Sequence, residues 1–98
     1  MRLQRQRRML TPGSVPGLKP HVRLQYDPVR GAWAVLSPEK VFWPDDVSLD
    51  ILRLCDGRHT VTEILQGLAA QYEAPPAEIA ADVEAFLQEW SDRSLVTL

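Results

Sequence analysis

The chain has 98 residues, with 11 Lys and Arg against 13 Asp and Glu, two histidines and one cysteine. A chain of this length builds one small domain with one hydrophobic core. One cysteine excludes an intrachain disulfide, and without a CxxC or HExxH pair no metal or other cofactor is expected. No apolar run approaches the roughly 20 residues that span a bilayer, so no membrane partner is expected. The single thiol suits a reducing cytoplasm.

The N-terminal residues differ in charge from the rest of the chain. Residues 1–8 contain four arginines and no acid, whereas the remainder carries 7 Lys and Arg against 13 Asp and Glu. The stretch "TPGSVPGLKP" that follows is rich in Pro and Gly, which is typical of a mobile linker. We therefore expect a flexible basic tail over residues 1–17 and a folded domain over 18–98. The tail is either a disordered extension or an arm for an acidic partner or for self-association, and Met9 is an alternative start of translation.

Three short stretches predict strands. In "HVRLQY" (21–26), Val22, Leu24 and Tyr26 alternate with polar residues, which is typical of a half-buried strand. The turn "DPVRG" leads to a second strand, "AWAVLS" (32–37), so the two form a hairpin. A third strand, "KVFW" (40–43), ends at Pro44, because proline cannot donate to a ladder.

The first helix is expected in "DDVSLDILRLCDG" (45–57). Asp45 or Asp46 supplies its N-cap, and Gly57 supplies the C′ position. Helical spacing predicts an apolar face made of Val47, Ile51, Leu52, Leu54 and Cys55.

Two more helices are expected. The second begins at Val61, because Thr60 and Glu63 have the spacing of a capping box, and its apolar face ends at Tyr72. The third begins at Pro76, a residue that suits the first helical position. Its apolar stripe contains Ile79, Val83, Phe86, Leu87 and Trp90. The final "SLVTL" adds a short extended segment. The predicted fold is α+β and winged helix–turn–helix-like, with a three-stranded antiparallel meander followed by a three-helix bundle.

The stretch "RLCDGRHTVTEI" contains Cys55, Asp56 and His59, three residue types that build cysteine-nucleophile sites. However, Cys55 shares the apolar face of the first helix, and His59 directly precedes the cap of the second. We therefore expect Cys55 to be a small core residue and His59 a loop residue at a helix junction. A redox or partner role for Cys55, and catalysis, are the alternatives.

A fold of this kind often binds DNA, but the charges argue against nucleic acid as a partner. The third helix (76–93) carries one arginine and five acids, namely Glu78, Asp82, Glu84, Glu89 and Asp92. Because phosphate contacts supply most of the affinity for DNA, a helix this acidic would be repelled from a groove.

Four blocks of the sequence closely resemble the PqqD family: "PHVRLQYDPVRGAW", "LSPEKVF", "ILRLCDGRHTVTEI" and "DVEAFLQEW". They occur in order and at the right spacing, and the resemblance covers about residues 18–96. It implies a peptide chaperone of pyrroloquinoline quinone biosynthesis that is not an enzyme. Such proteins bind the precursor peptide PqqA and present it to PqqE, a radical S-adenosylmethionine enzyme with iron–sulfur clusters. PqqE then crosslinks a glutamate and a tyrosine of the peptide. A homodimer is a further expectation.

The resemblance also implies where the peptide binds, which is beside the third strand and against the third helix. The strand supplies Lys40, Val41, Phe42 and Trp43, and the helix supplies Asp82, Val83, Phe86, Glu89 and Trp90. Unpaired backbone groups at a sheet edge would pair with the peptide, and its side chains would enter a groove. Core packing is the alternative role for Val83, Phe86 and Trp90. Pro44 departs from the family pattern, because it removes one possible ladder bond.

Two other functions stay open on the sequence alone. The nearer one is a recognition subunit for another ribosomally made, modified peptide. The more distant one is an enzyme, which an assay of the isolated chain for turnover would detect.

Overall fold

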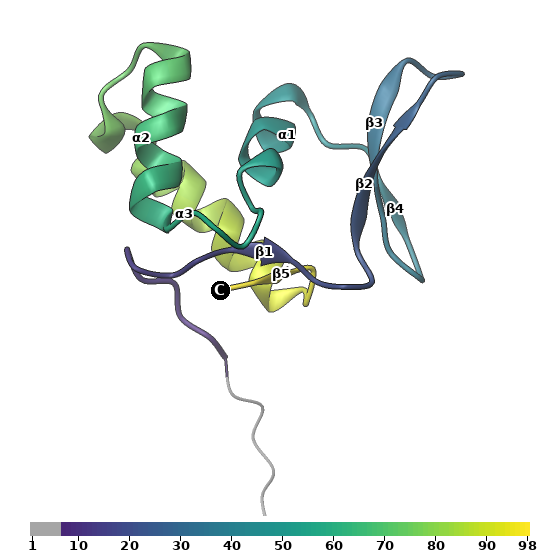
Figure 1. Ribbon diagram of the computed structural model, residues 1–98, viewed down its shortest axis with the longest axis horizontal. Helices are drawn as coiled ribbons and strands as arrows, with labels where there is room; N and C mark the ends of the chain where they lie inside the picture. The colour runs from purple at the N-terminus through teal and green to yellow at the C-terminus, as the bar shows by residue number, and fades with distance from the viewer. Residues whose placement is uncertain (1–6) are drawn as a thin grey trace, which may run out of the picture.

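The computed structural model describes residues 7–98 (Figure 1). In chain order the elements are β1 (Gly17–Leu18), β2 (Arg23–Asp27), β3 (Ala32–Leu36), β4 (Val41–Phe42), α1 (Asp46–Arg53), α2 (Val61–Tyr72), α3 (Pro76–Asp92) and β5 (Val96–Thr97). Three of the strands form an antiparallel sheet in the order β2-β3-β4, and β1 pairs with β5. α1 lies between that sheet and α2 (Figure 1). The α+β class is confirmed, with a three-stranded antiparallel sheet that precedes three helices.

The β2–β3 hairpin follows the expected alternation. Leu24 pairs with Val35, and Tyr26 pairs with Trp33, whose ring centroid lies 5.5 Å from that of Tyr26. The turn forms because the Asp27 carboxylate accepts the backbone N–H of Val29 at 2.9 Å. β2 begins two residues later than predicted, and Tyr26 remains 46% exposed at its far end. Only the first part of this face is therefore buried.

The helix starts agree with the local signals. Asp45 caps α1, and the capping box between Thr60 and Glu63 is present at the start of α2. Pro76 is the first residue of α3. These signals act within one turn, so their outcome does not depend on the rest of the fold.

The end of α1 differs from the prediction. The helix stops at Arg53 with Leu54 as its C-cap in the right-handed region, so Gly57 is not at C′. The N–H of Leu54 donates to Ile51, and the N–H of Cys55 donates to Leu52. These hydrogen bonds between residues three apart satisfy the carbonyls of Ile51 and Leu52, so the helix ends without a glycine in the left-handed region. Gly57, with φ of 75°, shapes the later turn instead.

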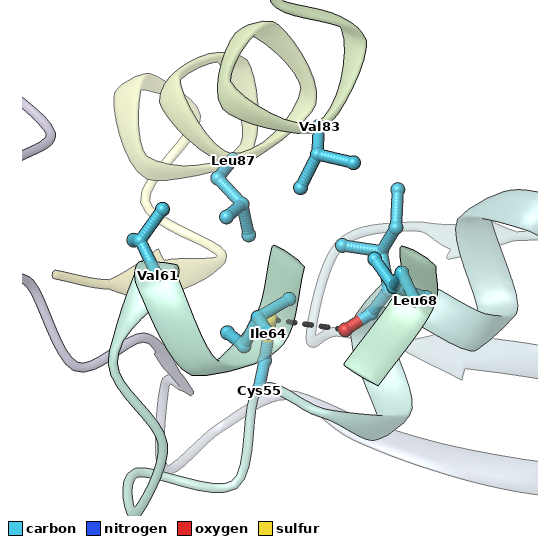
Figure 2. Close-up of a cluster of buried hydrophobic side chains, with 7 residues drawn as sticks. Cys55, Val61, Ile64, Leu68, Val83 and Leu87 are labelled. Atoms are coloured by element: carbon cyan, nitrogen blue, oxygen red, sulfur yellow. Dashed lines mark hydrogen bonds between the residues drawn. The ribbon is translucent and has the colours of Figure 1, made fainter. Parts of the chain in front are cut away.

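The core has two parts, joined by Phe86, which packs against both. The helix-side cluster contains Ile51, Cys55, Val61, Ile64, Leu68, Val83 and Leu87 (Figure 2). The sheet-side cluster contains Val22, Val35, Leu52, Trp90, Leu95 and Val96. α3 therefore contributes to both clusters and joins the sheet to the other helices.

Cys55 is confirmed as a core residue. Its side chain is 3% exposed, and its Sγ donates to the Ile51 carbonyl at 3.3 Å (Figure 2). Burial, with a smaller contribution from Asp56, raises the pKa of the Cys55 thiol to about 12. The thiol is therefore protonated in the folded protein, and its contribution to stability is lost only as pH rises above the unfolded value of about 8.5.

We expect Cys55→Ala to lower the free energy of unfolding by about 1 kcal/mol, the cost of a small core deletion. In the parent protein at pH 8, a thiol reagent should react at least about a hundredfold more slowly than in denaturant, because the folded thiolate is scarce. Urea denaturation and labelling kinetics measure both effects. Rapid labelling of the folded parent would contradict the core role.

Residues 10–17 differ from the expected mobile linker. The carbonyls of Pro12, Ser14 and Pro16 accept backbone N–H groups of Thr62, Val61 and Gly57 at 2.9–3.2 Å. Pro16 is among the fully buried side chains, and Leu10 packs against the helix-side cluster.

The segment then enters β1, which lies beside β5 (Figure 1). Residues 1–6, the first part of the expected tail, lie outside the described residues. The division at residue 17 and the tail's role stay predictions. No helix within residues 7–98 is long and apolar enough to cross a bilayer.

Candidate functional site

β4 has a backbone edge that faces away from the sheet. The strand order leaves β4 paired only with β3 among the described residues. The N–H of Ser37 donates to the Lys40 carbonyl at 3.0 Å, and Leu36 lies opposite Val41. Hydrogen-bonded and non-hydrogen-bonded pairs alternate along an antiparallel ladder. The N–H and C=O of Val41 therefore point outward, where an added strand could pair with them.

The side chain of Phe42 points to the helices and joins a row of three aromatic rings. The Phe42 and Trp90 centroids lie 5.5 Å apart, and those of Trp90 and Phe86 lie 5.1 Å apart in a stacked arrangement. Trp90 is 6% exposed, whereas Phe42 and Phe86 are half-buried. The row thus has a buried centre and two half-buried ends, each of which lines a hollow, and we call the row with its two hollows the groove.

One end of the groove is a hollow of about 410 Å³ beside the β3–β4 turn. Its lining includes Lys40, Phe42 and Arg93. The Lys40 ammonium lies 5.2 Å from the Phe42 centroid, and the Arg93 guanidinium lies 5.8 Å from it. His21 and Glu39 also line this hollow, so one lysine and one arginine lie beside one carboxylate there.

The other end is a hollow of about 200 Å³ between the three helices. Its lining is mostly apolar, with Asp45, Ser48 and Asp82 as polar members, and Val47, Ile51, Leu68, Tyr72, Ile79, Val83 and Phe86 as the others. The N–H of Ser48 donates to Asp45 at 2.8 Å and lowers the pKa of that carboxyl. The Tyr72 hydroxyl donates to Asp50, which raises the pKa of Tyr72. This hollow therefore combines an open apolar wall with an acidic rim.

The structure separates some of the residues that the resemblance grouped together. Trp43 lines a hollow on the other face of the sheet with Leu36 and Val41, and the Arg30 guanidinium lies 4.7 Å from its ring. Its side chain therefore does not face α3. Glu89 is exposed and lies 4.0 Å from Arg93, outside the lining of the hollow that contains Asp82. Lys40, Phe42, Asp82, Val83, Phe86 and Trp90 border the groove, and their binding role stays a prediction.

Several groove residues were not predicted from the sequence. Val47 and Tyr72 were expected on apolar helix faces, but Val47 is 54% exposed and Tyr72 is 43% exposed. Arg93 faces the groove because it follows Trp90 by nearly one helical turn, a relation visible in the sequence. His21 lines the hollow beside the β3–β4 turn because of the path that the chain takes into β2. No local signal in the sequence predicts that path.

The junction between α1 and α2 does not assemble a nucleophilic site. His59 Nδ1 lies 3.0 Å from Asp56 Oδ1, and the N–H of Arg58 donates to the same oxygen at 2.8 Å. The Cys55 sulfur is buried and bonded to Ile51. Asp56 and His59 therefore belong to a turn, and Cys55 belongs to the core.

A family model described as coenzyme PQQ synthesis protein D (PqqD) matches residues 32–96. The chain belongs to the PqqD family. A PqqA binding protein of Rhodopseudomonas palustris (strain BisB5) is 44% identical over 84 residues, covering 86% of this chain and 82% of the relative. One of Rhizobium meliloti (strain 1021) is 37% identical over 90 residues, covering 92% of each.

Solved PqqD structures share the fold. The NMR structure of the PqqD truncation of Methylobacterium extorquens PqqCD aligns with a TM-score of 0.75 and 37% identity, over 91% of this chain and 95% of that one. It is described as a functional, stand-alone recognition element for ribosomally synthesised and post-translationally modified peptides. The crystal structure of PqqD from Xanthomonas campestris aligns with a TM-score of 0.56 and 34% identity, over 92% of this chain and 100% of that one.

Proposed function

We propose that this chain binds the precursor peptide PqqA along the outer edge of β4 and holds it for modification by PqqE, without catalysing a reaction itself. Relatives that the chain largely covers are named PqqA binding proteins, which supports the choice of peptide. The observation that carries the proposal is the outward-facing backbone of Val41 beside the row Phe42–Trp90–Phe86. An edge beside an apolar groove is the arrangement that strand addition uses.

The peptide would extend the sheet as a further strand. Its backbone would pair with Val41, and every second side chain would enter the groove, because side chains alternate across a strand. Such backbone hydrogen bonds contribute about 0.5–1.5 kcal/mol each. They do not depend on the peptide sequence, so contacts of the peptide side chains with the groove would fix the register. Pro44 does not weaken this pairing. The backbone groups of successive residues alternate in direction, so an N–H at position 44 would point toward β3 and not toward the peptide.

Presentation to PqqE requires that the reacting part of the peptide stays outside the complex. Strand addition immobilises a short segment and leaves its flanks free to enter another protein. The radical chemistry would belong to PqqE and its cofactors. We also propose that the fold is winged helix–turn–helix-like and that the protein works in the cytoplasm. A second copy of the chain paired along β4 is the competing occupant of the edge, which sedimentation with and without peptide would detect.

Val41→Pro tests the proposal. Proline removes the outward N–H but none of the bonds to β3, so we expect a folded protein with PqqA binding weakened by about five- to thirtyfold, equivalent to roughly 1–2 kcal/mol. Calorimetry measures the affinity, and circular dichroism reports the fold. Val41→Thr is the matched control, since it keeps the N–H and the branched side chain and should bind within about twofold. Equal affinity of the two variants would move the peptide away from β4.

A further inference from the structure

The hollow between the helices lies where the chain leaves β4 and enters α1. β4 leads through Trp43 and Pro44 directly to Asp45, which lies on the rim of the hollow. Phe86 forms one wall, and its ring stacks on Trp90, whose ring in turn contacts Phe42. A peptide paired with β4 would therefore reach this hollow at the Pro44 end of the strand and the Lys40–Arg93 hollow at the other end.

The wall of the hollow offers apolar surface that the described chain leaves open. Val47 on α1 is 54% exposed and Tyr72 on α2 is 43% exposed, although both line it. The volume is about 200 Å³. This exceeds the roughly 150 Å³ of an apolar cavity that binds benzene, so the space has room for a large side chain. Exposed apolar residues gathered around a hollow are typical of a binding surface.

The two ends of the groove differ in charge. Asp45 and Asp82 line the helical hollow, and its lining contains no Lys, Arg or His among the described residues. The other hollow has Lys40 and Arg93 against Glu39. Within residues 7–98 the Lys40 ammonium has no carboxylate within 4.0 Å, and Arg93 has only Glu89 at 4.0 Å. A bound peptide would therefore meet an acidic end and a basic end.

We infer that the hollow between α1, α2 and α3 is a specificity subsite for the peptide, which takes an apolar side chain that has a lysine or arginine beside it in the peptide. The inference rests on the proposed function, because the same peptide must lie along β4. At the opposite end, Lys40 and Arg93 bind an acidic side chain of the peptide through opposite charge. The groove thereby fixes which way the peptide runs, which backbone pairing alone would leave open.

The test is a pair of double variants titrated with synthetic PqqA. Asp45→Asn/Asp82→Asn removes the acidic rim, and Asn preserves the cap of α1. Glu78→Gln/Glu84→Gln is the matched control, because it removes two acids of α3 that do not line the hollow. We expect the rim variant to bind about three- to tenfold more weakly than the parent at low salt and the control to bind within twofold, since contacts of this kind are modest and screened by salt.

The peptide side completes the test. Each lysine and arginine of PqqA is replaced by glutamine in turn. One such replacement should weaken binding to the parent protein but not to the Asp45→Asn/Asp82→Asn variant. Val47→Ser should also weaken binding about threefold with little change in thermal melting, because Val47 is half exposed. A rim variant that binds no worse than the control would overturn the subsite. Val41→Pro separates the two claims: if it still weakens binding, only the subsite fails, and if it does not, the β4 site fails as well.

Discussion

Trp90→Ala is expected to lower the free energy of unfolding by about 3–5 kcal/mol, the usual cost of deleting a large aromatic side chain from a core. Trp90 is 6% exposed and contacts Phe42 from the sheet and Phe86 from its own helix. It also belongs to the sheet-side cluster, so its loss leaves a cavity where α3 meets the sheet. Urea denaturation followed by fluorescence or circular dichroism measures the loss.

The chain offers a matched control for this change. Trp43→Ala removes the same side chain from a position that is 44% exposed, so we expect a loss below about 1 kcal/mol. Similar losses for the two variants would contradict the assignment of Trp90 to the core. A sheet that melts separately from the helices in Trp90→Ala would confirm that Trp90 joins them.

Removal of residues 1–18 is expected to destabilise the domain by about 3–5 kcal/mol, since it deletes buried apolar side chains and several backbone hydrogen bonds. The lost groups are Leu10, the buried Pro16, and the carbonyls that bind the start of α2 and the turn before it. β5 would also lose β1, its partner strand. Thermal melting of the shortened chain measures the effect.

Removal of residues 1–8 alone is the control for this truncation. It leaves Met9 as the first residue and deletes the ion pair between Arg7 and Asp92, whose N···O distance is 2.7 Å. Arg7 is largely exposed, so the melting temperature should change little. If both truncations melt like the full chain, residues 10–18 add nothing to the fold, contrary to their contacts.

The helix starts were predictable because their signals are local. A capping box needs Thr60 and Glu63 within one turn, and Pro76 sets its own φ. The pairing of β1 with β5 was not predictable, because it joins Gly17 to Thr97 across most of the chain. The Pro and Gly content of residues 11–20 predicted a mobile linker, because composition contains nothing about the surface against which these residues pack.

The candidate site was predictable at the level of elements, and less so at the level of side chains. β4 and α3 each contribute to the row of three rings and its two hollows, and the binding role that the family resemblance implied stays a prediction. The strand period of two places Val41 and Trp43 on the opposite face of the sheet from Phe42, so a continuous run of four residues could not all face α3. The contributions of α1 and α2 were missed because Val47 and Tyr72 satisfy the same helical spacing as true core residues.

Amide hydrogen exchange of Val41, followed by NMR with and without saturating PqqA, tests the central claim most directly. The Val41 N–H points away from β3, so in the free protein it should exchange faster than the N–H of Phe42, its neighbour on the ladder side. Strand addition would give it a peptide carbonyl as partner, and we predict that its exchange slows by at least about tenfold on binding, matching a backbone bond of roughly 1.4 kcal/mol. A Val41 exchange rate that stays the same while PqqA is bound would contradict the account.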